Sequence, residues 1–196
     1  MLNKYLRTLV VAVAALIANS QANGDIPSVF SGVRFQLLQP AITTSVGGHF
    51  VDSPSSGNTF FGAIVRLDDE TDFPNSGDLS TPDVVGATLL IFPDLSAEVF
   101  GDLALELDPG WYALVFGSGL FGANGSGAAV LNNLDIGTPS YIAFVPGSEW
   151  IEVSTLPGPF QNYRLVVMGN TIPEPSSVTA MLIAIGFVLF VRSAEH

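Results

Sequence analysis

Short apolar or alternating runs fill the chain between residues 29 and 168, and Gly, Pro, Asn, Asp and Ser separate them. No segment there has the period of about 3.6 residues that marks an amphipathic helix, and the runs have the length of strands. The second half of residues 97–107 alternates, which indicates a strand with one solvated face. The pattern predicts strands at residues 29–38, 46–51, 59–67, 84–92, 97–107, 111–116, 141–145, 150–154 and 163–168.

Nine strands at this spacing predict an all-β fold, an antiparallel β-sandwich of jelly-roll type. Residues 59–67 are apolar at positions of both parities, so this strand is expected in the middle of a sheet with both faces buried. Pro109 and Gly110 mark a turn before the strand at 111–116. There is no internal repeat and no domain boundary, which indicates one domain over residues 23–170.

The N-terminal segment has the pattern of a signal peptide. Lys4 and Arg7 precede nine apolar residues, a run too short to span a membrane. Ser20 and Ala22 provide the small residues that a signal peptidase recognises. We therefore expect residues 1–22 to be removed after export.

The C-terminal segment contains a second apolar run, of 14 residues, at 178–191. As a helix it would be about 21 Å long. This is shorter than the bilayer core of about 30 Å, a difference that flanking serines or local thinning would make up. We expect a transmembrane helix here, the alternative being a buried helix of a soluble domain. Basic residues outside both apolar runs (Lys4, Arg7 and Arg192) indicate cytoplasmic ends and a body outside the inner membrane.

The residues before this run carry a resemblance to a known family. Ile-Pro-Glu-Pro-Ser-Ser at 172–177, followed by the apolar run and Arg192, resembles the PEP-CTERM sorting signal of Gram-negative bacteria, a tail region also labelled after ice-binding proteins. The resemblance makes residues 171–196 a sorting tail with Pro173, Glu174, Pro175 and Arg192 as its signal. It implies processing by an exosortase, a multi-pass membrane cysteine protease, in a bacterium that makes exopolysaccharide. Pro173 and Pro175 also favour an extended backbone that a protease can reach.

The charge of the chain limits the classes of molecule that it is expected to bind. The formal net charge is −12, and between residues 23 and 172 three arginines face sixteen acidic residues. This balance argues against nucleic acid and against binding anionic lipid or polysaccharide by charge alone. The chain has no cysteine, so an exported body must rest on its core rather than on disulfides.

An acidic run offers the one candidate cofactor, calcium. Five carboxylates lie within eleven residues, and Ca²⁺ binds six to eight oxygens. The run is not an EF-hand, because Phe73 occupies the position of the required glycine. The alternative is a solvated acidic loop that needs no ligand. The candidate ligands are Asp68, Asp69, Glu70, Asp72 and Asp78.

Other motifs give little support to catalysis. The G-x-G-x-x-G pattern at 117–122 is not followed by a helix-forming run, so we expect a loop between two strands rather than a nucleotide site. His49 is the only histidine of the body, and neither Ser118 nor Ser126 lies in a G-x-S-x-G motif. The sequence therefore predicts no catalytic residues and no enzyme activity.

Trp111 and Trp150 are candidate stacking platforms for sugar rings, the alternative being that they belong to the core. Together with the tail, these patterns predict an exported envelope or matrix protein that is structural or adhesive among exopolysaccharide. Its expected partners are the exosortase-type protease, the inner membrane and exopolysaccharide. The alternative function is an extracellular carbohydrate-binding or polysaccharide-active protein.

Overall fold

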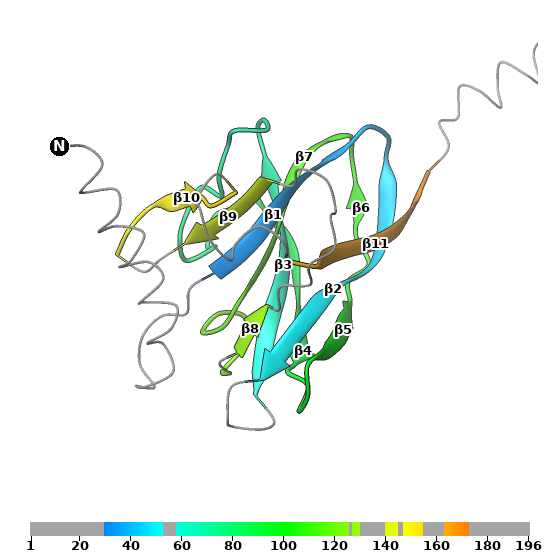
Figure 1. The fold of residues 1–196 in the computed structure, drawn as a ribbon. Coiled ribbons are helices and arrows are strands. Elements are labelled where there is room, and N and C mark those ends of the chain that lie inside the picture. Colours follow the sequence, from blue (N-terminus) through cyan, green and yellow to red (C-terminus); the bar gives the residue numbers. More distant parts are fainter. Residues whose placement is uncertain are drawn as a thin grey trace, which may run out of the picture.

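Eleven strands form two antiparallel sheets in the computed structural model, which describes residues 30–52, 58–125, 127–129, 140–144, 147–154 and 163–172 (Figure 1). Every regular element in these ranges is a strand, so the expected all-β antiparallel class is confirmed. None of the described residues forms a helix long and apolar enough to span a membrane. The expected signal segment at 1–22 and the apolar run at 178–191 lie outside the described residues.

Sheet A contains six strands, and the predicted strand at 59–67 lies inside it between two neighbours. Its bounds match the prediction, and residues 60–65 are buried. The expectation of a central strand with two apolar faces is confirmed. The order across the sheet is β10 (Trp150–Glu152), β9 (Ser140–Phe144), β1 (Phe30–Leu37), β7 (Gly110–Gly117), β3 (Thr59–Leu67) and β4 (Val84–Ile91).

Sheet B is built around one long strand, β2 (Ala41–Asp52), which has partners along both of its sides. The register places β11 and β8 along one side of β2, and β5 and β6 along the other. These partners are β11 (Leu165–Thr171), β8 (Gly127–Ala129), β5 (Ala97–Asp102) and β6 (Glu106–Leu107).

Three features of sheet B differ from the sequence prediction. The expected strand at 97–107 is divided into β5 and β6, and the hydroxyl group of Thr43 of β2 bonds to the residues between them. The Thr43 hydroxyl donates to the Leu103 carbonyl (2.5 Å) and accepts from the Leu105 amide (3.0 Å). Strand β2 begins at Ala41, five residues before the predicted start, and the short strand β8 was not predicted.

Side chains from both sheets meet in one apolar cluster, which we call the inner cluster. Strand β2 contributes Val46 and Phe50, and β3 contributes Phe60 and Ile64. The alternating residues Phe61, Ala63 and Val65 of β3 belong to a second cluster on the opposite face of sheet A. We call the faces that meet in the inner cluster the inner faces of the sheets, and the others the outer faces.

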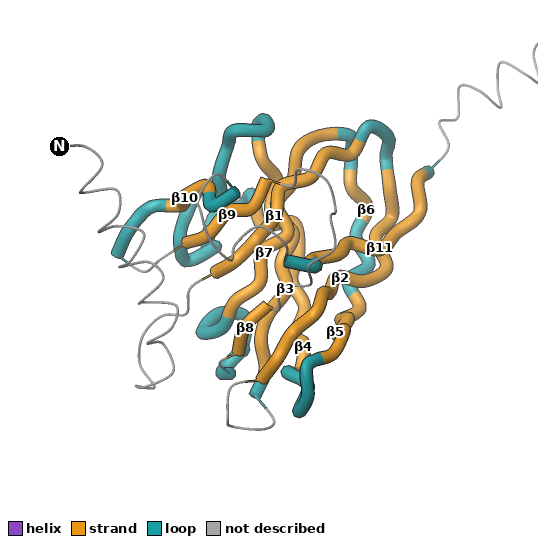
Figure 2. The backbone as a smooth tube through the Cα atoms, in the orientation of Figure 1, coloured by secondary structure: helices purple, strands orange, loops and turns teal. Residues whose placement is uncertain are grey.

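Loops cover the outer face of sheet A. The cover loop, residues 68–83 between β3 and β4, contributes Phe73 and Leu79 to the second cluster, and the glycine loop, residues 118–125 after β7, contributes Leu120 and Ala123. Figure 2 shows the cover loop in teal beside β9 and β10. The fit is close: a Cβ added to Gly77 would lie 2.0 Å from the ring of Phe144. Both faces of the central strands β7 and β3 of sheet A are therefore packed.

The outer face of sheet B has a different character. Ile42, Phe100 and Met168 are exposed there, and none of the described core clusters includes them. The ring of Phe100 lies over Gly47 of β2, where an added Cβ would be 2.5 Å from it. Sheet B is thus packed on its inner face and open on its outer face.

Candidate functional site

The predicted sorting signal follows directly on the last described residue. Strand β11 ends at Thr171, and the amide of Ile172 donates a hydrogen bond to the carbonyl of Pro40 (2.7 Å). Pro173, Glu174, Pro175 and Arg192 lie outside the described residues. The signature therefore follows directly on a residue whose backbone is hydrogen-bonded to the described body.

The acidic run forms the cover loop, and its first carboxylates hold the loop itself. Asp69 accepts hydrogen bonds from the amide and hydroxyl of Thr71 (both 2.7 Å) and from the amide of Asp72 (3.1 Å). The bonds from Thr71 lower the pKa of Asp69 below its usual value. Asp72 in turn accepts from the amide of Asp68 (2.8 Å). These are turn-forming bonds of the kind that aspartate makes with its own backbone.

The last carboxylates of the cover loop act in the same way. Asp78 accepts from the hydroxyl (2.7 Å) and the amide (3.2 Å) of Ser80, and the hydroxyl bond is the largest cause of its lowered pKa. Asp83 accepts from the amide of Asn75 (2.8 Å). Among the described residues, no three His, Cys, Asp or Glu side chains are grouped so that they could hold a metal ion. The candidate calcium ligands thus share one loop, and the structure gives three of them, Asp69, Asp72 and Asp78, bonds within it.

Arg34 ties the cover loop to sheet A, and sequence reasoning did not identify it. Its side chain is 2% exposed and forms an ion pair with Glu152 of β10 (2.9 Å). A second guanidinium nitrogen donates to the carbonyl of Glu70, and the ring of Phe73 lies 4.6 Å from the guanidinium carbon. The loop is therefore anchored by a buried cation that contacts both its backbone and its aromatic side chain.

The tryptophans predicted as sugar platforms occupy the packed face of sheet A. Trp150 is only 9% exposed, its ring packs 5.4 Å from that of Phe144, and its indole nitrogen donates to the carbonyl of Ser76 in the cover loop (3.3 Å). Trp111 is partly buried against the same cluster. Trp150 is thus part of the core in this structure, since the cover loop closes over the short strand that carries it.

The G-x-G-x-x-G segment forms a tight loop, as expected. Gly119 and Gly122 have φ values of +84° and +86°, in the left-handed region that glycine adopts without strain. The amide of Gly119 donates to the carbonyl of Ala123 (2.9 Å), which closes the loop on itself. No helix follows it in the described residues, so the helix N-terminus that a dinucleotide site requires is missing there.

His49 has a partner that the sequence did not suggest. Its Nε2 atom lies 2.9 Å from the hydroxyl oxygen of Ser96, in the turn before β5. Glu98, which pairs with His49 in the β2–β5 register, forms an ion pair with Arg164. The contact between His49 and Ser96 is exposed to solvent, whereas catalytic sites generally exclude water around the nucleophile and base. This pair therefore resembles a surface hydrogen bond more than a catalytic dyad.

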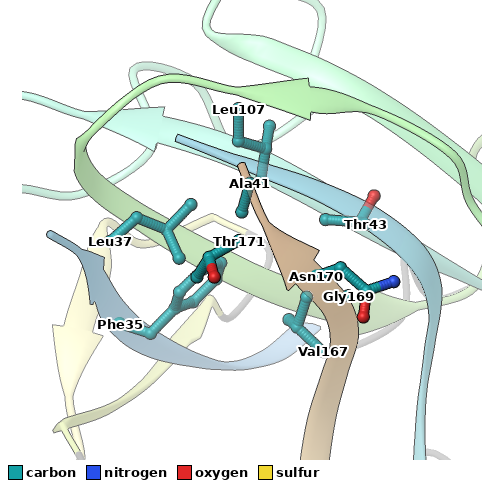
Figure 3. A pocket seen from close by; sticks show the side chains of 9 residues that line it. All are labelled: Phe35, Leu37, Ala41, Thr43, Leu107, Val167, Gly169, Asn170 and Thr171. Atoms are coloured by element: carbon teal, nitrogen blue, oxygen red, sulfur yellow. The ribbon is translucent and has the colours of Figure 1, made fainter. Parts of the chain in front are cut away.

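A cavity of about 180 Å³ lies between the two sheets at the end where β11 finishes (Figure 3). Its walls are apolar side chains, and Asn170 and Thr171 supply polar groups. The hydroxyl of Thr43, which also lines it, is used by the bonds to Leu103 and Leu105. The remaining lining residues are Phe35, Leu37, Ala41, Leu107, Val167 and Gly169.

This cavity has the size of a small apolar group rather than of a cofactor. A dry cavity of about 150 Å³ holds benzene, and ligand pockets usually exceed about 300 Å³. No lining residue is ionisable, so the cavity offers no general acid or base. It is suited to receive one aliphatic or aromatic side chain or the end of an acyl chain.

The few arginines of the body are the sequence feature that could have drawn attention to Arg34 and its ion pair. The body has three, and each forms an ion pair: Arg34 with Glu152, Arg66 with Asp108 and Arg164 with Glu98. In so acidic a chain every cation is expected to find a carboxylate, but the partner of Arg34 is 118 residues away and no local pattern indicates it.

No protein-family model, curated protein or solved structure matches this chain.

Proposed function

We propose that the chain is an exported envelope or matrix protein, sorted by a PEP-CTERM-type tail, with a structural or adhesive role among exopolysaccharide. The observation that carries the proposal is the position of the signature. The amide of Ile172, the residue directly before Pro173, is hydrogen-bonded to the carbonyl of Pro40 in the body. A membrane protease acting on residues 173–175 would therefore meet a substrate that begins at the edge of a folded domain.

In this proposal the two terminal segments act one after the other. Residues 1–22 direct export, and residues 178–191 then hold the exported body at the inner membrane, with Arg192 on the cytoplasmic side. An exosortase-type protease next cleaves the tail and releases the body towards the cell surface or the matrix. Glu174 marks the start of the membrane-embedded part, because a carboxylate resists entry into the bilayer.

We further propose that the body is a β-sandwich of jelly-roll type that acts as a passive scaffold. Three observations support this. The inner faces of the two sheets share one cluster, the outer face of sheet A is filled by loops, and the cavity at the end of β11 has no ionisable lining. In addition, Asp69, Asp72 and Asp78 of the cover loop accept hydrogen bonds within its turns. Such a body provides surface and stability rather than acid–base chemistry.

The sorting proposal is tested with the full chain in a host that carries the exosortase. Mass spectrometry of the mature protein is expected to find a C-terminus that lacks the apolar run. A Pro173→Ala/Pro175→Ala double variant is expected to keep its tail and stay in the inner-membrane fraction. Pro157→Ala/Pro159→Ala, with the same spacing inside the body, is the matched control and is expected to be processed normally. A wild-type protein that retains Ser193 to His196 would contradict the proposal.

A further inference from the structure

The outer face of sheet B spans the strands β11, β2 and β5, which lie side by side in Figure 1. Val46 and Val167 point into the inner cluster, so their neighbours in each strand point to the outer face. Neighbouring strands lie about 4.8 Å apart, so residues opposite each other in the register can contact one another. Apolar and polar groups are therefore close neighbours on this face. In the order β11, β2 and β5, its two middle rows contain Val166, Gly47 and Phe100, and Met168, Ser45 and Asp102.

Three exposed apolar side chains form the centre of this face. Ile42 is 40%, Met168 45% and Phe100 37% exposed. The ring of Phe100 lies over Gly47 of the neighbouring strand, which has no side chain to cover it. The ring is therefore supported by the backbone of β2 and remains accessible to solvent. We call Ile42, Met168 and Phe100 the open patch.

Two carboxylates beside the open patch have no cation partner among the described residues. Asp102 is two residues after Phe100 on the same face of β5, and Glu106 of β6 lies opposite Ile42 in the register. Both acidic residues are exposed. The arginines of the described body form their ion pairs with other carboxylates. Asp102 and Glu106 therefore offer charged hydrogen-bond acceptors at the border of the open patch.

The charge and polarity of this face limit the molecules that can cover it. An anionic polymer would be repelled by the two unpaired carboxylates. A protein surface that covered the open patch would bury these carboxylates, which is unfavourable unless it brings a cation to each of them. A neutral sugar ring has C–H groups on its face, which suit an aromatic ring, and hydroxyl groups on its edge, which donate charge-assisted hydrogen bonds to carboxylates. The face is thus complementary to a neutral polysaccharide.

We propose that the outer face of sheet B binds a neutral polysaccharide, with a sugar ring stacked on Phe100 and sugar hydroxyl groups donating to Asp102 and Glu106. This inference rests on the adhesive role proposed above and adds to it the surface and the class of ligand. Between Gly47 and Ile42 strand β2 is about 16 Å long, at about 3.3 Å per residue. The face therefore has room for consecutive rings of one sugar chain that runs along β2.

A single face of this kind is expected to bind weakly. Its hydrogen bonds form at an exposed surface, where water competes for the same groups. We therefore expect a Kd of about 1 mM for one site. Several copies of the protein on one polysaccharide chain would hold it together far more firmly, because each bound site raises the effective concentration of the next. Weak single sites are thus compatible with adhesion in a matrix.

The first test is affinity electrophoresis of the full chain in mild detergent, through gels that contain laminarin, dextran or galactomannan, three neutral polysaccharides. At least one of them is expected to retard the wild type, and Phe100→Ala to raise the Kd about tenfold. Phe121→Ala is the matched control, because Phe121 is 43% exposed on the glycine loop, away from sheet B. Equal effects of the two variants, or a wild type that none of the three retards, would overturn the proposal. Phe100→Leu replaces Phe100→Ala if circular dichroism finds the latter unfolded.

The second test addresses the carboxylates. Asp102→Ala is expected to raise the Kd for the neutral polysaccharide about threefold or more, whereas Asp94→Ala, which removes an exposed carboxylate from the turn before β5, should leave it unchanged. The binding should persist at about 1 M salt, where charge attraction is screened. Retardation by the cationic polymer chitosan alone, or equally by anionic alginate, would refute a site for neutral sugars. These gels need no exosortase, so a failure of sugar binding and a failure of tail processing are observed separately.

Discussion

The outer faces of the two sheets differ in how their apolar side chains are covered. On sheet A, the cover loop and the glycine loop bury Phe61, Ala63 and Val65, and Arg34 anchors the cover from below. On sheet B, the corresponding face keeps Phe100 and Met168 exposed, and Phe100 shares it with the exposed carboxylates Glu98 and Asp102 of the same strand. The same chain thus uses one sheet as a central layer with two packed faces and the other as an outer layer.

The difference is visible in the composition of the strands. Strand β3 is apolar at nearly every position, as expected for a strand buried on both faces. Strand β2 mixes Thr, Ser and Gly with apolar residues, as expected for a strand with one solvated face. The layer to which a strand belongs is therefore encoded in the strand itself, even though the loops that cover it are distant in sequence.

The largest loss of stability is expected when a buried side chain is removed from the packed outer face of sheet A. Phe61→Ala removes a fully buried ring that contacts Phe30 and Phe121, and should lower the free energy of unfolding by about 3–5 kcal/mol. Phe100→Ala removes the same group from the open face and should cost less than about 1 kcal/mol. Chemical denaturation of both variants measures the difference. Equal losses would mean that the two faces are not distinct.

The second comparison concerns ion pairs on the two faces. Arg34→Met leaves Glu152 without its buried partner and detaches the cover loop, so we expect a loss of about 2–3 kcal/mol and faster proteolysis within residues 68–83. Arg164→Met breaks the pair with Glu98 on sheet B, where the two side chains are 35% and 41% exposed. Its loss should stay below about 1 kcal/mol. A larger loss for Arg164→Met would reverse the comparison.

Acid is expected to loosen the cover of sheet A before it unfolds the sheets. The pKa values of Asp69 and Asp78 are lowered in the folded chain, so their contribution is present above the ordinary value of 3.8 and is lost as the pH falls through the folded values. Both tryptophans of the chain lie against the covered face. Their emission should shift to the red below pH 3.8 while the far-ultraviolet circular dichroism persists. Asp69→Asn, which keeps the acceptor oxygen, should weaken this pH dependence; an unchanged profile would assign it elsewhere.

The smallest effect is expected from calcium. Asp69, Asp72 and Asp78 already accept hydrogen bonds from the cover loop, and a cation would have to compete with them. Millimolar Ca²⁺, added after the metal has been removed, should therefore change the melting temperature by less than about 2 °C. A rise of several degrees that is lost in Asp69→Asn would restore the calcium hypothesis for this loop.

Local patterns predicted some elements and could not have predicted others. The bounds of β3 follow from an apolar run that ends at Val65, two residues before the strand gives way to the acidic run, and need no knowledge of the rest of the chain. Between β5 and β6 the chain bonds to the hydroxyl of Thr43, about 60 residues earlier. A single sequence does not reveal such a contact, because any Thr in a strand is an equally good donor.

The candidate site shows the same limit. The acidic run was identified from the sequence, but whether its carboxylates would bind a cation or their own backbone depends on loop geometry. Trp150 sits in a three-residue strand, where the pattern does not reveal which face is buried. The cavity between the sheets joins residues from β1, β2, β6 and β11, so it exists only once the topology is known.

The position of β11 has a mechanical consequence. Any pull on the chain beyond Ile172 reaches the body through this strand, which among the described strands pairs with β2 alone, along seven residue pairs. Leu165 and Val167 fix the far half of the strand in the inner cluster, while the four residues nearest the pull, Met168 to Thr171, are exposed. Under load the strand would detach from its exposed end inwards, so that the first four residue pairs yield before the core is disturbed. A body tethered by its C-terminus would thus have a short extensible segment between its anchor and its fold.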